Sequence, residues 1–261
     1  MKRQEITKQG CLWWMAGVLS VALMACGGSG DNGNNSGQTD ANENAILLDD
    51  ANGAQYNPVI DPVHFVGAVD NPYFTLTQGK RWVYEGTNGE GVVERVEIEV
   101  TGDTRVILGI TTQVVRERAY EDGDLVEDTF DWYAQDMNGD VWYFGEDSKD
   151  IDEGQVVGTA GSWEAGVNGA KPGIIMKGNP QVGDAYRQEF LAGEAEDIAE
   201  VLSISESVQI GLGSYVGCLR IKEWTPLDPN VVEHKFYCKE TGNVTVEEKV
   251  VGGEGRIEWI E

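Results

Sequence analysis

The chain has 261 residues, with 45 acidic and 19 basic side chains and a formal net charge of −26 at pH 7. Binding to the phosphate backbone depends on Lys and Arg, so this balance argues against a nucleic-acid partner. It also argues against electrostatic docking on anionic lipid headgroups. The acidity fits cation binding, attraction of basic partners, or a soluble surface adapted to salty surroundings.

The N-terminus has the order of an export signal. Lys2, Arg3 and Lys8 precede an apolar run over residues 11–25, which is shorter than the about 20 residues of a membrane span. Residues 23–26 read LMAC and resemble the lipobox of bacterial lipoproteins. This resemblance implies a signal peptide over 1–25, cleaved before Cys26, whose sulfur then carries diacylglycerol. An ordinary secretory signal that is cut nearby is the alternative.

A lipidated Cys26 would make the membrane a partner of the protein. Stable anchoring takes two or more acyl chains, palmitate among them, which a cysteine of this class carries. The predicted location is therefore the bacterial cell envelope. Gly27 follows the cysteine where an Asp would signal retention, and the resemblance then implies the outer membrane if the organism is Gram-negative.

Residues 26–55 are mostly small and polar and cannot bury a core, so we expect a disordered tether after the lipidated cysteine. Its root-mean-square reach is on the order of 30 Å. Residues 56–261 show no second change of composition, which predicts one β-rich domain.

Alternation of apolar and charged residues indicates strands through this domain. Val96, Ile98 and Val100 alternate with charged residues over 92–100, as expected for an antiparallel sheet with one wet face. Many such segments separated by turn signals predict an all-β fold. We expect an antiparallel meander that forms a barrel-like or strongly curved sheet. Residues 194–203 fit a short helix or the entry to a strand, and the glycine-rich segment 151–183 fits a long loop.

Two turn signals predict the register of neighbouring strands. Centred on Asp122-Gly123, Arg118 would pair with Glu127 and Val115 with Phe130. Centred on Asn138-Gly139, Tyr133 would pair with Phe144.

Export leaves Cys218 and Cys238 as an even pair in an oxidising compartment. If 218–224 and 231–238 form a hairpin around the loop 225–230, the two cysteines face each other at a separation that suits a disulfide. We therefore predict a cross-strand disulfide.

An acidic run over residues 146–153 is a candidate Ca²⁺ site, because Ca²⁺ takes six to eight oxygen ligands. Its candidate ligands are Asp147, Asp150, Asp152 and Glu153. A solvated acidic loop explains the run as well.

Aromatic residues gather in one third of the chain, and five of them are candidates for a ligand pocket: Trp82, Tyr84, Trp132, Trp142 and Phe144. On adjacent strands they would line a site for an apolar or sugar ligand. A well-filled core is the alternative.

No motif assigns a catalytic residue. His234 stands beside Glu233, but neighbouring residues of a strand point to opposite faces, so we interpret His234 as half of a cross-strand pair with Lys222. His64, the other histidine, has no local partner in the sequence.

Several sequence strings resemble an uncharacterised family of bacterial secreted proteins and lipoproteins. They are NPYF with GKRWVY (71–74, 79–84), DWYAQD with VWYFGED (131–136, 141–147), GSWEAG with PGIIM (161–166, 172–176) and TPL with VEHK (225–227, 232–235). Thr75 departs from the proline expected after the first string. The resemblance covers residues 70–261 and implies export and a β-rich domain, but no activity.

Together these features favour a lipid-anchored envelope protein that acts as a non-enzymatic binding or interaction module, with a small molecule or an envelope protein as partner. The alternatives are a calcium- or cation-binding surface protein and a hydrolase of envelope or extracellular polymers.

Overall fold

The computed structural model describes residues 56–261, so the predicted signal, the tether and Cys26 lie outside the described residues. Within 56–261, no helix is long and apolar enough to cross a membrane. A short 3-10 helix, η1 (Pro62–His64), comes before the strands. The strands are β1 (Asp70–Asn71), β2 (Phe74–Thr75), β3 (Arg81–Thr87), β4 (Val93–Ile107), β5 (Ile110–Glu121), β6 (Asp124–Gln135), β7 (Val141–Asp147), β8 (Asp150–Asp152), β9 (Gln155–Gly158), β10 (Trp163–Glu164), β11 (Lys171–Met176), β12 (Ala185–Arg187), β13 (Glu189–Phe190), β14 (Ile198–Ile210), β15 (Gly213–Thr225), β16 (Asp228–Cys238), β17 (Asn243–Val251) and β18 (Gly255–Trp259).

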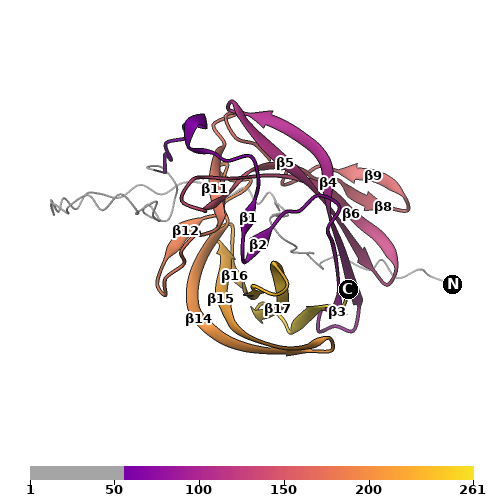
Figure 1. Ribbon diagram of the computed structural model, residues 1–261. Coiled ribbons are helices and arrows are strands. Elements are labelled where there is room, and N and C mark those ends of the chain that lie inside the picture. Colours follow the sequence, from indigo (N-terminus) through magenta and orange to yellow (C-terminus); the bar gives the residue numbers. More distant parts are fainter. Residues whose placement is uncertain (1–55) are drawn as a thin grey trace, which may run out of the picture.

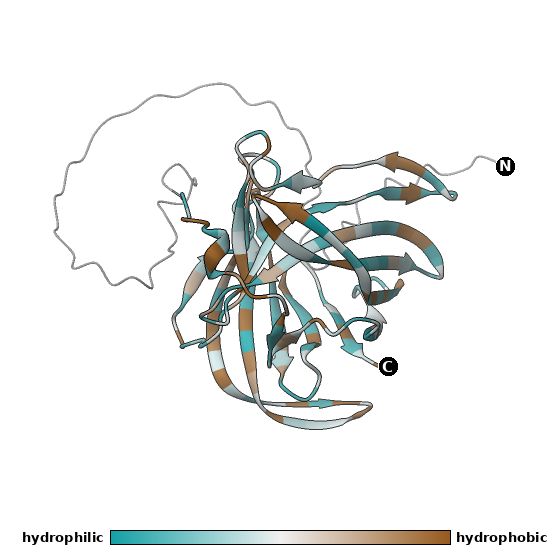
Figure 2. Cartoon of the chain, turned by 45° about the horizontal axis from the view of Figure 1, so that its top comes forward, coloured by the Kyte–Doolittle hydropathy of each residue, from teal (hydrophilic) through white to brown (hydrophobic). Residues whose placement is uncertain are grey.

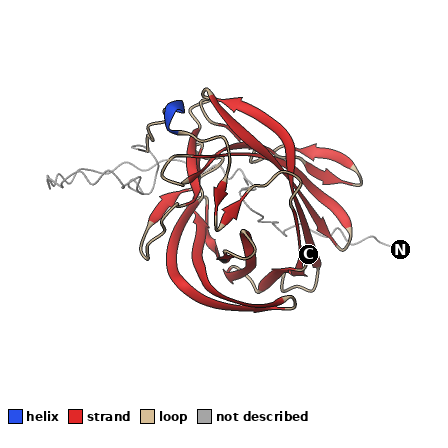
Figure 3. Cartoon of the chain, viewed as in Figure 1, coloured by secondary structure: helices blue, strands red, loops and turns tan. Residues whose placement is uncertain are grey.

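One strongly curved antiparallel sheet forms most of the domain (Figures 1 and 3). Its strands lie in the order β12-β14-β15-β16-β17-β18-β3-β4-β5-β6-β7-β11-β13. The two end strands, β12 and β13, are consecutive parts of the chain separated by Gln188. The sheet therefore curves until its first and last strands meet in the segment 185–190. The predicted all-β, strongly curved antiparallel sheet is confirmed.

Alternation along β4 decides which side chains face the inside of this curve. Val96, Ile98 and Val100 are buried as predicted. Glu97 points outward and pairs with Arg81 of β3 at 2.8 Å and Arg118 of β5 at 3.0 Å. The same apolar and polar alternation is visible along the long strands in Figure 2. The sheet thus keeps one apolar face inward and one charged face in water.

The Asp122-Gly123 turn joins β5 and β6, as expected. Both residues have positive φ, 48° and 93°, which is the backbone of a two-residue hairpin turn. The predicted register beyond it is wrong by one residue: Arg118 pairs with Asp128, and Val115 with Asp131. A bulge in β6 opposite Ala119 and Tyr120 leaves Val126 as the extra residue, and no turn motif predicts it.

In the β6–β7 hairpin the predicted register is wrong next to the turn, and the bulge restores it further along the strands. Tyr133 pairs with Tyr143, not with Phe144, and a register shift separates this pair from the pairing of Asp131 with Glu146. The bulge puts Asp131 and Glu146 directly opposite each other.

The structure decides the form of two other segments. The segment 194–203 enters β14, so of its two predicted forms the strand entry is confirmed and the short helix is not; its alternate residues Ala199 and Val201 pack in the core. The segment 151–183 is not one long loop. It contains β9, β10 and β11, and β11 adds to the edge of β7.

The β1–β2 hairpin lies inside the curve of the sheet (Figure 1). Its Asn71 side-chain amide donates to the carbonyls of Gly139 and Lys177 on one side. On the other side, the amide of Thr75 donates to the carbonyl of Gly242. Phe74 packs against Tyr133 with ring centroids 5.2 Å apart. The hairpin therefore links the two walls of the curved sheet.

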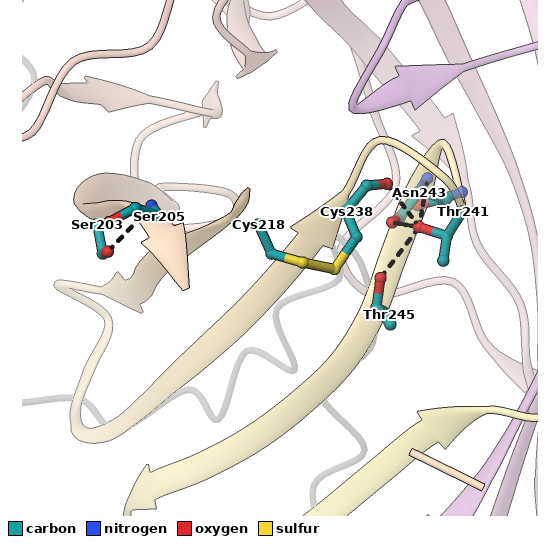
Figure 4. Close-up of a disulfide and its surroundings, with 7 residues drawn as sticks. All are labelled: Ser203, Ser205, Cys218, Cys238, Thr241, Asn243 and Thr245. Carbon is teal, nitrogen blue, oxygen red and sulfur yellow. Dashed lines mark hydrogen bonds between the residues drawn. A yellow bond between two sulfur atoms is a disulfide. The ribbon is translucent and has the colours of Figure 1, made fainter. Parts of the chain in front are cut away.

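The disulfide joins Cys218 of β15 to Cys238 of β16, with a Cα–Cα distance of 4.3 Å (Figure 4). The pairing of Leu219 with Tyr237 has the predicted register, so the hairpin geometry that predicted the disulfide is confirmed. Thr241 follows the second cysteine, and its hydroxyl lies 2.8 Å from the Cys238 carbonyl. Val208 and Val246 pack with both sulfurs in a second apolar cluster.

We expect the disulfide to contribute about 3 kcal/mol to the free energy of unfolding, because it closes a loop of 20 residues in the unfolded chain. Urea unfolding of the chain carrying both Cys218→Ala and Cys238→Ala measures this loss. Adding reductant to the unsubstituted chain is the matched control and should give a similar loss. Equal stability with and without the bond would contradict the expectation.

Candidate functional site

A cavity of about 380 Å³ lies where residues 59–65 meet the β6–β7 turn. The carbonyl of His64 accepts from the amide of Met137 at 2.8 Å, which joins the two segments. This volume is in the range of small-molecule sites. We call it the rim pocket, and its lining residues are Val59, Asp61, His64, Phe65, Asp136, Met137, Asn138, Asp140, Trp142 and Lys177.

Asp136 builds the wall of the rim pocket from the turn. Its Oδ1 accepts from the amides of Asn138 at 2.8 Å and Asp140 at 3.0 Å, a local arrangement that Asp favours. Its Oδ2 accepts from the indole Nε1 of Trp142 at 3.1 Å. The carboxylate therefore fixes both the turn and the orientation of the tryptophan ring.

Two aromatic rings, those of Phe65 and Trp142, belong to the lining of the rim pocket. Phe65 packs edge-to-face on Trp142, with centroids 6.4 Å apart, and on Phe144 at 5.6 Å. Trp142 and Phe65 line the cavity, whereas Phe144 lies behind them in the core. The packing holds these rings rigid before any ligand arrives.

Charged and polar groups complete the lining of the rim pocket. The Asp140 carboxylate accepts from the amide of Gly178 at 2.7 Å and lies 3.5 Å from Lys177 Nζ. Asp61 accepts from the amide of Val63 and so caps η1. The His64 side chain is exposed. The lining therefore combines hydrogen-bond donors and acceptors with aromatic rings in one small cavity.

The structure does not bring the five aromatic residues of the predicted ligand pocket to one cavity. Trp142 lines the rim pocket, but Trp82, Tyr84 and Phe144 are fully buried in the core. Trp82 Nε1 and Tyr84 Oη donate to the carbonyls of Thr241 and Val244. Trp132 lies under the guanidinium of Arg105, 4.2 Å from its ring centroid.

The structure also spreads out the predicted Ca²⁺ ligands. Asp147 pairs with Lys149 at 2.8 Å, Asp150 and Asp152 lie in β8, and Glu153 begins the turn to β9. Residues 56–261 contain no group of three His, Cys, Asp or Glu side chains that could hold a metal ion. Burial raises the pKa of Asp150. Calcium binding gains no geometric support from this arrangement.

His234 pairs with Lys222, as interpreted from the sequence, and the buried Glu233 lies on the opposite face of β16. Burial lowers the pKa of His234, and Arg220 lowers it further. The structure therefore separates this imidazole from the carboxylates inside the sheet.

A group of buried carboxyl groups inside the sheet has no counterpart among the sequence predictions. The Tyr143 hydroxyl lies 2.7 Å from Asp131 Oδ1 and 3.0 Å from Glu146 Oε2. A phenol carries one proton, so one of the two carboxyl groups must supply the proton of the second bond. Nearby, Trp163 Nε1 donates to Glu189 Oε2 at 2.8 Å. Among the described residues 56–261, Glu146 Oε1 and Glu189 Oε1 have no hydrogen-bond partner.

Burial is the main reason why these carboxyl groups hold protons. It raises the pKa of Asp131 to about 8, against the lowering effect of its bond to Tyr143. Burial, with the neighbouring Asp131, raises the pKa of Glu146 well above its ordinary value. Burial and Asp197 do the same for Glu189. The cluster is therefore at least partly neutral at pH 7.

The comparisons with known proteins identify no relative. No protein-family model and no curated protein matches the chain. The crystal structure of a candidate lipoprotein from Parabacteroides distasonis matches with a TM-score of 0.35 and 10% sequence identity. The match covers 72% of this chain and 96% of that chain. A similarity this low carries no argument about fold or function, so the site rests on its own geometry.

One sequence signal could have indicated the buried carboxyl groups. Every second residue of a strand points to the same face. Asp131 stands two residues from Tyr133, and Glu117 stands two residues from Val115 and from Ala119, so both acids are expected to point inward. Bulges interrupt this alternation, and their positions are not known from the sequence.

We expect stability to fall as the pH rises from about 4 to about 8. Folded Asp131 keeps its proton up to pH about 8, whereas the unfolded chain releases it near pH 4, so the unfolded state binds fewer protons between these values. Asp131→Asn should remove part of this dependence and raise the free energy of unfolding at pH 8.5 by about 1–3 kcal/mol. Urea unfolding at pH 5.5 and pH 8.5 measures both effects.

Asp124→Asn is the matched control, because Asp124 is exposed at the hairpin turn. It should leave the pH dependence unchanged. If Asp131→Asn kept the full pH dependence of the parent chain, the shared-proton interpretation would be wrong.

Proposed function

We propose that this protein is a lipid-anchored envelope protein that binds a small polar molecule in the rim pocket without transforming it. The observation that supports the proposal is the cavity of about 380 Å³, whose lining combines the aromatic rings of Trp142 and Phe65 with the polar side chains of His64, Asp140 and Lys177.

The lining favours a ligand with one apolar face and several hydroxyl groups, such as a mono- or disaccharide. An aromatic ring covers the apolar face of such a molecule, and the carboxylate and the ammonium serve its hydroxyl groups. A purely apolar ligand would leave Lys177 and Asp140 without solvent, which is costly. A polyanion would meet the carboxylates of Asp61, Asp136 and Asp140.

The position of the pocket also fits a binding module. Its wall consists of rigid hydrogen bonds within the β6–β7 turn and between that turn and η1. Such a site needs little reorganisation on binding, which lowers the entropic cost. The protein would present this pocket at the envelope through the lipid on Cys26.

The binding test uses the purified chain and a library of mono- and disaccharides, followed by ligand-observed NMR. We expect hits with dissociation constants in the millimolar to micromolar range. Lys177→Ala and His64→Ala should weaken them by about tenfold, because each removes a polar contact inside the cavity. Lys239→Ala is the matched control, since Lys239 lies 5.0 Å from the Tyr73 ring and does not line the pocket.

Hits that bind equally well to all three variants would show that the ligand lies elsewhere. A library without any hit would remove the sugar class from the proposal.

The anchor has its own test. Labelled palmitate should enter the wild-type chain but not Cys26→Ser, and the variant should move from the membrane to the soluble fraction. Cys11→Ser is the matched control, because Cys11 lies inside the predicted signal. Label in the Cys26→Ser chain, or loss of membrane attachment in the control, would contradict lipidation at Cys26.

A further inference from the structure

Large apolar side chains are exposed together at one end of the domain. Four short segments carry them: the segment 59–66 around η1, the β4–β5 turn, the β6–β7 turn and the loop before β11. Each of these residues is between 39% and 90% exposed. We call the set the apolar end, and its members are Val59, Val63, Val66, Val106, Leu108, Met137 and Val167.

Contacts between the four segments show that the apolar end is continuous. A side-chain carbon placed on Gly109 of the β4–β5 turn would lie 3.3 Å from Pro62 Cγ of η1. One placed on Gly166, before β11, would lie 2.6 Å from Leu108 Cδ2. On its other side, η1 joins the β6–β7 turn through the backbone hydrogen bond at the rim pocket. Figure 1 shows η1 (indigo) and the β4–β5 turn (magenta) together at the top of the molecule.

The β4–β5 turn carries a leucine where its backbone favours a polar residue. Leu108 and Gly109 have φ of 50° and 81°, close to the 48° and 93° of Asp122 and Gly123 in the β5–β6 turn. Asn and Asp adopt this left-handed backbone more readily than Leu, because their short polar side chains form local hydrogen bonds. The domain does not bury the leucine in return, since Leu108 is exposed. A leucine held in this way at a turn tip points to a contact outside the domain.

The apolar end lies where the domain joins the predicted tether. Val59 comes three residues after Tyr56, with which the described part of the chain begins. A tether over 26–55 has a root-mean-square reach on the order of 30 Å, so a chain held by Cys26 keeps this end within reach of the bilayer. Tethering also raises the effective concentration of a weak contact.

The composition of the apolar end favours lipid over a protein partner. Its members are valine, leucine and methionine, and none is aromatic or charged. Protein interfaces depend mainly on Trp, Tyr and Arg, whereas Leu and Val contribute less often. Small apolar side chains on turns can enter the boundary between headgroups and acyl chains without a partner surface of matching shape. The net charge of −26 disfavours anionic headgroups, so neutral headgroups suit this end.

We propose that the apolar end docks on the surface of a bilayer with neutral headgroups, with the β4–β5 turn and η1 at the headgroup boundary. The proposal rests on the lipid anchor of the proposed function, because the contact alone is small. Docking would hold the rim pocket at the membrane surface, since Val59 and Met137 belong to both the apolar end and the pocket lining.

The test uses the mature chain, residues 26–261, coupled through the Cys26 thiol to a maleimide lipid in phosphatidylcholine vesicles. Cys218 and Cys238 form the disulfide, which leaves Cys26 as the reactive thiol. Leu108→Trp adds a fluorophore at the turn tip, and lipids brominated in the acyl chain quench a tryptophan that enters the bilayer. We expect them to quench the added fluorescence by about half or more.

Leu212→Trp is the matched control. Leu212 is exposed in the β14–β15 turn, where the neighbouring amide of Gly211 donates to Glu258 Oε1. Figure 1 shows this turn at the bottom of the molecule, far from η1. Brominated lipid should leave its added fluorescence unchanged.

A second variant tests whether the other members of the apolar end contribute. Val63→Ser and Val106→Ser, combined with Leu108→Trp, should reduce the quenching by about twofold, because docking strength scales with the apolar area buried. Both valines are exposed, so the melting temperature should stay that of the Leu108→Trp chain.

Three results would overturn the proposal. They are no quenching of Leu108→Trp by brominated lipid, equal quenching of Leu108→Trp and Leu212→Trp, and unchanged quenching after the two serine substitutions. Protection of Leu108→Trp from both brominated lipid and aqueous acrylamide would assign the apolar end to a second copy or another protein. Because the coupling supplies the anchor chemically, a failure here differs from a failure of lipidation at Cys26, which the palmitate label reports.

Discussion

The buried ammonium of Lys235 lies between the carboxylates of Glu223 and Glu247. Among the buried side chains of residues 56–261, such cations are far fewer than carboxyl groups. A sheet that curves until β12 and β13 meet has one inward face, and every inward side chain shares its space with those of distant strands. Carboxyl groups on that face cannot all be ionised, because each lacks water and few have a counter-charge. Within residues 56–261, bound protons, hydrogen bonds from tyrosine hydroxyl groups and the ammonium of Lys235 stabilise them.

The groups that stabilise these buried carboxyl groups differ along the sheet. At the β6–β7 end, Tyr143 bridges Asp131 and Glu146, so the proton is held by geometry as well as by burial. Near β16, Gln188 and Tyr237 add their hydrogen bonds to Glu223, which already pairs with Lys235. Glu233 lies opposite Lys249 of β17, and Lys249 and Lys235 lower its pKa against the larger raising effect of burial.

The carboxylates of the rim pocket differ from those of the interior in their hydrogen bonding. Its acids are satisfied: Asp136 accepts three hydrogen bonds, and Asp140 accepts from Gly178 and pairs with Lys177. Carboxylates that already accept hydrogen bonds from the protein keep a fixed position. A pocket that combines such carboxylates with aromatic rings suits recognition of a neutral polar molecule. The protein therefore has two acidic environments, one at the rim pocket where backbone amides donate to the carboxylates, and one inside the sheet where burial raises the pKa of the carboxyl groups.

Much of the architecture was predictable from the sequence, because strand periodicity and turn motifs act locally. The alternation over 92–100 predicted the face of β4, and the spacing of Cys218 and Cys238 around one hairpin predicted their bond. Tertiary structure alone decided the bulges at Ala119/Tyr120 and between Asp131 and Tyr133, which change the register without a sequence signal. It also decided which carboxyl groups meet inside the sheet. Long-range curvature sets that proximity, and no local pattern along a strand records which distant strand its side chains will face.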